Sequence, residues 1–250
     1  YTWSISPTVG GITVDQNGYV HVADTTTAGT YTQTVKVQDS IGSFDTKSIT
    51  VTVNTEISVG AGGDLLTTQG IETSTTFTKS FGTGTLTFGL TDTITGITIS
   101  ALGVVTAANT LTSIDSVTTR IYYDTVTATD ILGVKGYKAF KVTVKPPVLI
   151  AAGSNVVTTY QVREYSAAFT SDSRTGTGTK LWTIGPDNIP GVSISSGGVV
   201  TVESTTAIGI YYETVTVTDA VGSFAQKAIR IQVNPRPVIG SGNNIVTTYG

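Results

Sequence analysis

The chain has 250 residues, a net charge of −3, only 12% charged residues and no cysteine. The lack of cysteine excludes a disulfide framework and thiolate metal sites, and the sparse charge is unlike a basic nucleic-acid-binding surface. Apolar runs are too short to cross a bilayer, so no membrane span is expected in this segment. Threonine supplies 50 residues, and its branched Cβ favours strands. Composition therefore predicts an all-β protein.

One stretch of sequence occurs three times at nearly constant spacing. Residues 31–39, 122–130 and 211–219 share a first tyrosine, a central Thr-Val pair and a final aspartate, at intervals of 91 and 89 residues. A second signature, at residues 65–68, 156–159 and 245–248, has the same intervals. A period of this length exceeds that of solenoid repeats and fits a small autonomous domain. The chain is therefore predicted to be a tandem array.

The repeat boundaries are predicted after Asn54, Lys145 and Asn234, and prolines follow the last two as short, semi-rigid links. The array then consists of the C-terminal part of one repeat, two full repeats and the first strand of a further repeat: residues 1–54, 55–145, 146–234 and 235–250. The two end fragments together have 70 residues, against 89 in the last full repeat. We therefore expect one long chain that continues on both sides, with strand donation between subunits as the alternative.

The first predicted strand of the chain carries a large aromatic residue. Trp3 occupies this position, with Phe88 and Trp182 as its counterparts, and we interpret the three as core anchors of a two-sheet sandwich. A short strand follows, and residues 15–18 are interpreted as a hairpin turn rather than a calcium loop. His21, the only histidine, is expected to face solvent rather than act as a base.

The repeated stretch and the strand after it are predicted to form the closing hairpin. Apolar residues alternate with polar ones in both strands, which indicates a half-buried antiparallel pair. The inward residues begin with a tyrosine in the first strand and end with three apolar residues in the second: Tyr31, Tyr122 and Tyr211; then Ile49, Val51 and Val53, Phe140, Val142 and Val144, and Ile229, Ile231 and Val233. The turn between the strands requires a positive φ at Gly42, Gly133 and Gly222.

With this pattern the chain resembles the immunoglobulin-like (Ig-like) repeats of bacterial surface proteins, which are similar to dystroglycan-type cadherin-like domains. The likeness lies in residues 11–22 and 28–31, in the turn at Asp39 and in the closing strand. It implies tandem Ig-like or cadherin-like antiparallel β-sandwiches of about seven strands each, in large secreted or cell-surface proteins that often are adhesins or stalks. The third copy fits equally well through residues 191–202 and 209–211.

The second copy departs from this pattern in two ways. Arg120 stands where the other copies have Gly29 and Gly209, and the loop of residues 106–122 is six residues longer than its counterpart in the third copy. Surface loops carry binding functions more often than the strands that support them. This loop is therefore the place where the copies are expected to differ in binding.

An aspartate before each turn and a lysine eight residues later recur in every copy: Asp39 and Lys47, Asp130 and Lys138, Asp219 and Lys227. Carboxylates at a domain pole are weak calcium candidates, because Ca²⁺ needs six to eight oxygen ligands. We favour the alternative that each aspartate caps its turn through backbone amides while the lysine neutralises it. A Lys–Asn/Asp isopeptide crosslink would need a catalytic carboxylate that the pattern does not supply. No cofactor is therefore expected.

Other motifs in the sequence do not indicate catalysis. Residues 82–85 and 176–179 read Gly-Thr-Gly-Thr, but no helix follows to form a phosphate site, and we interpret them as flexible loops between strands. No Ser/His/Asp set is repeated across the units. The chain is therefore predicted not to be an enzyme.

The function expected from these observations is that of an extracellular, repetitive structural segment at the cell surface: a fibre, an adhesin stalk or a surface-layer component. Its partners would be neighbouring repeats of the same chain or identical subunits, without nucleic acid. One alternative is a module that binds cell-surface glycans or proteins through its loops, above all the loop of residues 106–122. Another is a linker array within a secreted hydrolase.

Overall fold

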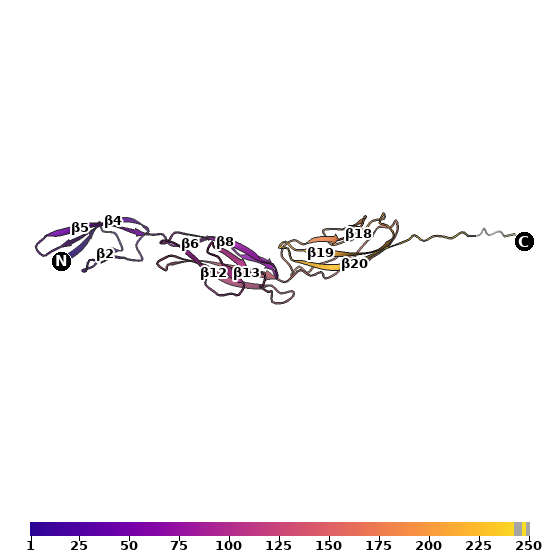
Figure 1. Cartoon of the computed structure of the whole chain (residues 1–250), viewed down its shortest axis with the longest axis horizontal. Helices are drawn as coiled ribbons and strands as arrows, with labels where there is room; N and C mark the ends of the chain where they lie inside the picture. The colour runs from indigo at the N-terminus through magenta and orange to yellow at the C-terminus, as the bar shows by residue number, and fades with distance from the viewer. Residues whose placement is uncertain (243–246, 249–250) are drawn as a thin grey trace.

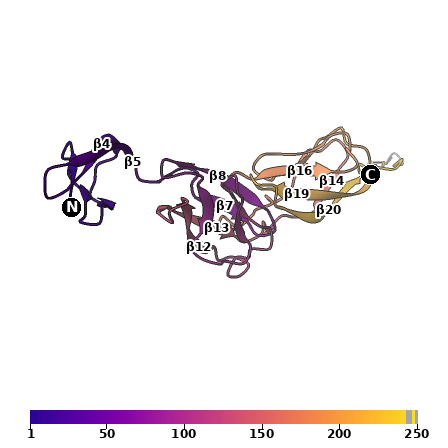
Figure 2. The ribbon, with the colours of Figure 1, turned by 60° about the vertical axis from the view of Figure 1, so that its left-hand side comes forward.

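A computed structural model describes residues 1–242 and 247–248, and every regular element within them is a β-strand. These strands form three units that follow one another along the longest axis of the molecule (Figure 1). The first unit contains β1–β5, the second β6–β13 and the third β14–β20. Figure 2 shows the single chain segment that joins the first unit to the second. The described residues contain no helix that could cross a membrane.

The second unit is a sandwich of two four-stranded sheets, in the orders β10-β11-β8-β6 and β7-β13-β12-β9. Its strands are β6 (Ser58–Ala61), β7 (Leu65–Thr68), β8 (Thr73–Ser80), β9 (Thr87–Leu90), β10 (Ile97–Ile99), β11 (Val104–Ala107), β12 (Arg120–Thr129) and β13 (Lys135–Lys145). Buried residues from both sheets meet between them, including Phe77 and Val105 from one and Val126 and Val142 from the other. The predicted all-β sandwich class is confirmed.

The first strand of this unit is divided between the two sheets. β6 pairs antiparallel with β8, whereas β7 runs parallel to β13, with Leu65 opposite Val142. The chain crosses between the sheets at Ala61 and Gly62, which both have positive φ. A Cβ on Gly62 would lie 2.5 Å from the Phe77 ring, so a larger residue does not fit. The parallel pair is not predicted from the sequence, because alternating apolar residues indicate a strand's faces and not its partner's direction.

The third unit repeats this arrangement with the sheets β14-β20-β19-β16 and β15-β18-β17. Its strands are β14 (Val156–Thr159), β15 (Glu164–Tyr165), β16 (Leu181–Gly185), β17 (Val192–Ile194), β18 (Val200–Val202), β19 (Gly209–Thr218) and β20 (Phe224–Asn234). β14 runs parallel to β20, as β7 runs to β13. Ile229, Ile231 and Val233 of the closing strand are buried, as predicted from their alternation.

The first unit has an open core. Its sheets are β1-β4-β5 and β2-β3, formed by β1 (Thr2–Ser6), β2 (Ile12–Val14), β3 (Val20–Val22), β4 (Gly29–Gln38) and β5 (Phe44–Val53). Within the described chain, no strand pairs with the second edge of β3 or of β5. Val22 is consequently 45% exposed, whereas its counterpart Val202 in the third unit is 0% exposed.

Beyond β20, the described residues 235–242 and 247–248 form no strand. The predicted opening strand of a further repeat also includes residues 243–246 and 249–250, which lie outside the described residues. This assignment and the three repeat boundaries stay predictions.

One inward position in the first strand of the long hairpin carries a buried polar residue in every unit: Gln33 in β4, Asp124 in β12 and Glu213 in β19. Asp124 Oδ1 accepts hydrogen bonds from the Thr91 hydroxyl and from the N–H of Asp92. The Glu213 carboxylate has no partner among the described residues. The counterpart of Asp92 in the third unit is Pro186, which has no N–H to donate.

Replacing Glu213 by glutamine should therefore raise the free energy of unfolding of the third unit by about 1–2 kcal/mol at neutral pH, because a buried carboxylate without a donor destabilises the fold. Urea unfolding followed by Trp182 emission, in a Trp3→Phe background, measures the change. The matched control is Asp124→Asn in the second unit, which has no tryptophan and is therefore followed by calorimetry. This variant should lose stability because Asp124 does have donors. A loss of stability in Glu213→Gln would contradict the prediction.

Candidate functional site: the joints between units

The repeated aspartate closes the turn of each long hairpin. Asp39 Oδ1 accepts the N–H groups of Ile41 at 3.0 Å and Ser43 at 2.9 Å. Asp130 Oδ1 and Asp219 Oδ1 accept the N–H groups of the equivalent residues at 2.9–3.0 Å. The glycines of these turns, Gly42, Gly133 and Gly222, have φ values of 96°, 84° and 92°. One carboxylate oxygen of each aspartate is thus occupied by its own turn.

The second carboxylate oxygen of Asp130 and of Asp219 binds a Gly-Thr-Gly-Thr loop at the same pole of the unit. The N–H of Thr83 donates to Asp130 Oδ2 at 3.0 Å, and the N–H of Thr177 donates to Asp219 Oδ2 at 2.7 Å. The glycines on both sides of each threonine have positive φ, between 65° and 73°, which turns the threonine N–H toward the carboxylate. These loops are therefore anchored to the hairpin turn, contrary to the expectation of flexible connections.

The joint between the second and third units adds a side chain from the preceding unit. Thr68, the last residue of β7, donates its hydroxyl to Asp219 Oδ2 at 2.6 Å, and its Oγ1 lies 2.9 Å from Thr177 Oγ1. Because the single Thr68 proton is used on the carboxylate, the Thr177 hydroxyl donates to Thr68. All three residues are buried. Asp219 thus accepts hydrogen bonds from its turn, from the loop and from the neighbouring unit.

The joint between the first and second units uses the equivalent loop of the second unit, at residues 82–85, with a different partner. Asn54 Nδ2 donates to Thr83 Oγ1 at 3.0 Å, and the N–H of Gly82 donates to the carbonyl of Thr55 at 3.1 Å. The described first unit has no strand equivalent to β7, so no threonine equivalent to Thr68 is present at Asp130. This joint therefore lacks the hydroxyl–carboxylate bond.

The recurring lysines lie away from these aspartates. Lys138 Nζ donates to the carbonyl of Ala61 and lies 5.8 Å from the centre of the Phe77 ring, and Lys227 Nζ lies 5.9 Å from that of Phe169. The hairpin register places Lys138 opposite the buried Val126, so its stem points toward the core and not toward the turn. None of the ion pairs in the described chain joins Lys47, Lys138 or Lys227 to an aspartate. The expected neutralisation of the aspartates by these lysines is wrong.

The surroundings of Asp219 also bear on the calcium candidates. Ca²⁺ requires a cage of oxygen atoms, whereas the groups that point at this carboxylate are three N–H donors and one O–H donor. Asp130 has three N–H donors. The joints are thus built to bind a carboxylate rather than a cation.

The tyrosines near the start of β4, β12 and β19 fasten the preceding loops. The hydroxyl of Tyr31 donates to the carbonyl of Thr27 at 2.7 Å, and that of Tyr211 to the carbonyl of Ala207 at 2.9 Å. In the second unit the longer loop displaces the acceptor, and Tyr122 donates to the carbonyl of Thr112 at 3.2 Å. The arrangement resembles the tyrosine corner of Ig sandwiches.

The aromatic anchors are only half-buried at Trp3, Phe88 and Trp182. The fully buried aromatic residues are Phe77 and Phe169. Phe77 lies 5.6 Å from Phe140 and Phe169 lies 6.5 Å from Trp182, between ring centres. Neither phenylalanine is predicted from the sequence, because both belong to a part of the repeat that the first unit lacks, and the position therefore occurs only twice.

Asp130 makes the second unit sensitive to acid. Burial raises the pKa of its carboxyl, but the N–H groups of Thr83, Val134 and Leu132 outweigh burial and hold the pKa below its ordinary value of 3.8. A carboxyl with a depressed pKa in the folded state stabilises the fold above its unfolded pKa, and this contribution is lost as pH falls through the folded value. The thermal stability of the second unit should therefore decrease once the pH drops below about 4.

Calorimetry of the native chain and of Asp130→Asn between about pH 7 and about pH 2.5 tests this linkage. The stability difference between the two should shrink as the pH falls. Glu72→Gln, at an exposed carboxyl of the same unit, is the control and should leave the acid profile unchanged. A constant difference between native and Asp130→Asn would contradict the prediction.

No protein-family model and no curated protein matches the sequence. Among solved structures, the chain is similar to three extracellular cadherin domains of Drosophila N-cadherin, with 14% identity and a TM-score of 0.32 over 94% of this chain and 89% of that chain. It is also similar to three Ig domains of titin, with 13% identity and a TM-score of 0.42 over 94% and 88%, respectively. Ig domains 1–4 of sidekick-1 give 13% identity and a TM-score of 0.37 over 93% and 67%. These are distant likenesses to tandem cadherin and Ig domains, and the sandwich class rests on the strand pairing described above.

Proposed function

We propose that this chain is a non-enzymatic, extracellular structural segment, which spaces other parts of a fibre, adhesin stalk or surface layer through hydrogen-bonded joints. The observation that carries the proposal is the buried joint at Asp219, where the second and third units share one carboxylate. A flexible tether between two sandwiches would not require a buried polar contact of this kind.

The chemistry of the joint favours a fixed angle between the units. The link at residues 145–147 is short and contains Pro146 and Pro147, which restrict the backbone. The N–H of Gly176 in the third unit donates to the carbonyl of Pro146 at 2.8 Å. Bending the joint would break the bond from Thr68 and leave a buried carboxylate with fewer donors, which is unfavourable. We infer that the joint resists bending.

The location at the cell surface is supported by the resemblance to Ig-like repeats of bacterial surface proteins. We propose repeat boundaries after Asn54, Lys145 and Asn234, which place each joint at the end of a repeat's closing strand. An antibody against the segment should label intact cells of the source organism. Labelling only after the cells are opened would contradict the extracellular assignment.

The rigidity of the joint is tested by measuring a distance between units. Because the chain has no cysteine, the changes Glu72→Cys and Ser196→Cys place one spin label on each side, at exposed residues. Electron paramagnetic resonance should give a narrow distance distribution, which Thr68→Val should broaden by removing the hydroxyl. Thr159→Val, at the equivalent position of the third unit, is the matched control and should change nothing. A broad distribution in the native background would refute the rigid-spacer function.

A further inference from the structure

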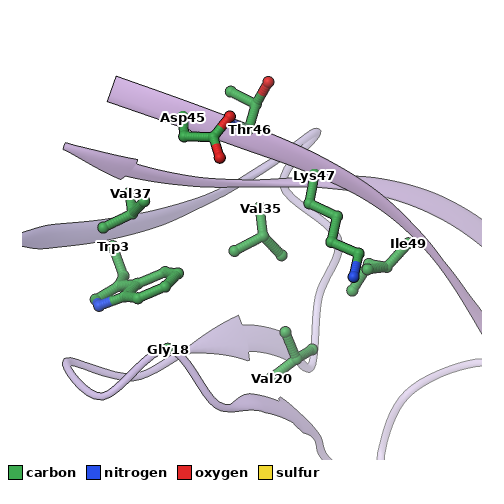
Figure 3. A pocket seen from close by; sticks show the side chains of 9 residues that line it. All are labelled: Trp3, Gly18, Val20, Val35, Val37, Asp45, Thr46, Lys47 and Ile49. Carbon is green, nitrogen blue, oxygen red and sulfur yellow. The ribbon is translucent and has the colours of Figure 1, made fainter. Parts of the chain in front are cut away.

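Two hollows in the surface of the described chain differ in what lines them. The first, of about 330 Å³, lies in the open core of the first unit, where Val20 faces Val35 (Figure 3). The counterparts of these two residues in the third unit, Val200 and Val215, are buried. This hollow is therefore lined by core positions.

The second hollow, of about 450 Å³, belongs to the second unit and borders its joint to the third. Its walls are the loop of residues 112–116, the side chains of Gln69 and Arg120, and Pro147 of the link, and we call it the loop pocket. Gln69 directly follows Thr68, the residue of the second unit that takes part in the joint. The volume lies within the range of about 300–1,000 Å³ that is usual for small-ligand sites.

Both departures of the second copy from the repeat pattern meet in the loop pocket. Arg120 stands where the first and third units have Gly29 and Gly209. A Cβ on these glycines would lie 3.3 Å and 3.2 Å from the hydroxyl oxygen of the tyrosine two residues later, closer than an ordinary van der Waals contact. In the second unit Tyr122 reaches the carbonyl of Thr112 instead, and the Arg120 guanidinium lies 5.9 Å from the Tyr122 ring centre. The longer loop thus provides the room that an arginine needs here.

The loop is held in shape by its own hydrogen bonds. The buried Ser113 donates its N–H to Gln69 Oε1 at 3.0 Å. The N–H groups of Val117 and Thr118 donate to Asp115 Oδ1 at 2.8 Å, and the Thr118 hydroxyl donates to Asp115 Oδ2 at 2.9 Å. The side-chain acceptor oxygens of Gln69 and Asp115 are therefore occupied from within the loop.

The donors of the loop pocket, by contrast, are free. None of the ion pairs in the described chain includes Arg120, whose guanidinium has five N–H donors. The hydrogen bonds among the described residues include no acceptor for this guanidinium or for Gln69 Nε2. Thr112 and Ser116 add exposed hydroxyl groups. The pocket therefore offers a ligand several donors and a guanidinium without an ion-pair partner.

These groups fit a ligand that combines a carboxylate with several hydroxyl groups. A guanidinium binds a carboxylate through two parallel hydrogen bonds, and side-chain hydroxyls and amides bind neutral hydroxyl groups. Ile114, which is 58% exposed, and Pro147 provide apolar surface for the C–H groups of a sugar ring. A peptide would need a free strand edge or an apolar cleft for its side chains, whereas the walls here are a loop, two polar side chains and a proline.

We propose that the loop pocket binds a carboxylate-bearing sugar residue of an acidic glycan. Arg120 binds the carboxylate, which belongs to a hexuronic acid or to a sialic acid. Gln69 Nε2 and the hydroxyls of Thr112 and Ser116 bind the ring hydroxyls. The first and third units have glycine in place of Arg120, so one site per chain is expected. This binding site adds to the proposed spacer function and does not depend on the rigidity of the joint.

Isothermal titration calorimetry of the 250-residue chain with trigalacturonate and with 3′-sialyllactose tests the proposal and separates the two sources of the carboxylate. At least one of the two saccharides should bind saturably at one site per chain. Its uncharged counterpart, methyl-esterified trigalacturonate or lactose, should bind at least about tenfold more weakly, because the charge-assisted pair is lost. In nuclear magnetic resonance spectra of the same chain, the Arg120 Nε–H and Gln69 side-chain amide signals should shift during the titration.

Substitutions at Arg120 make the test specific. Arg120→Gln should weaken binding at least about tenfold, and Arg120→Lys, which keeps the charge without the planar fork, should weaken it less. Lys141→Gln is the matched control and should leave binding unchanged, because it removes a positive charge of the same unit outside the pocket. No saturable binding of either acidic saccharide, equal binding of the uncharged counterpart, or equal effects of Arg120→Gln and Lys141→Gln would each overturn the proposal. Binding of triglycine as tight as that of the acidic saccharides would overturn it in favour of a peptide partner.

Discussion

Replacing Asp219 by alanine is expected to lower the free energy of unfolding of the third unit by about 3–5 kcal/mol and to loosen its joint to the second unit. The change leaves the N–H groups of Thr177, Val221 and Ser223 and the hydroxyl of Thr68 without their common acceptor. Most of this cluster is buried, so water replaces the lost bonds poorly. Urea unfolding followed by Trp182 emission in a Trp3→Phe background measures the loss of stability.

The matched control is Asp130→Ala, whose effect on the second unit is measured by calorimetry because that unit has no tryptophan. Asp130 has the same backbone donors but no hydroxyl from a preceding unit, so its loss should be smaller by roughly the 1.5–3 kcal/mol of one charge-assisted bond. The spin-label distance between the second and third units should broaden in Asp219→Ala and stay narrow in Asp130→Ala. Equal effects of the two substitutions would contradict a special role of Asp219 in the joint.

The closing hairpin and its turns could be predicted from sequence because their causes are local. Alternating apolar residues place Ile229, Ile231 and Val233 on one face whatever the rest of the chain does. The turn at Gly222 could be predicted for a similarly local reason, since a tight turn with positive φ excludes most other residues. Repetition of both features three times made the periodic array apparent as well.

The joint could not be predicted, because its bonds connect residues far apart in sequence. Thr68 and Asp219 are 151 positions apart, and their contact depends on how the end of one sandwich rests on the pole of the next. The Gly-Thr-Gly-Thr loops have the composition of flexible connections, and only the position of the aspartate beside them reveals their role. Proximity in sequence suggests Asp130 as the partner of Lys138, but the hairpin register decides that the Lys138 stem covers the core.

The buried phenylalanines show how an incomplete repeat hides a structural position. Phe77 and Phe169 lie in the part of the repeat that precedes Trp3 and its counterparts, so the first unit offers no third example for comparison. The sequence alone therefore points to Trp3 as the anchor, although in the third unit its counterpart Trp182 is half-buried and packs against Phe169. The real centre of each complete core is the pair of rings, not one aromatic residue.

Replacing Phe169 by alanine should consequently be among the most damaging single changes in the third unit, with a loss of about 3–5 kcal/mol in the free energy of unfolding. The Phe169 ring fills the space between Trp182 and Lys227, and a Cβ on Gly153 would lie only 2.2 Å from it, so the surroundings are shaped to the ring. Alanine removes the ring and leaves a cavity that a twisted sandwich cannot fully close. Trp182 emission during urea unfolding reports the loss and, in the folded state, should shift to longer wavelength.

Phe224→Ala is the control for that experiment. Phe224 belongs to the same unit but is 62% exposed, so its removal should change stability by no more than about 0.5 kcal/mol. The folded state of Phe169→Ala would resemble, in the third unit, the open core of the first, and the emission of Trp182 should then approach that of Trp3. A loss below about 1 kcal/mol, or a Trp182 emission unchanged by the substitution, would mean that the ring does not hold the two sheets together.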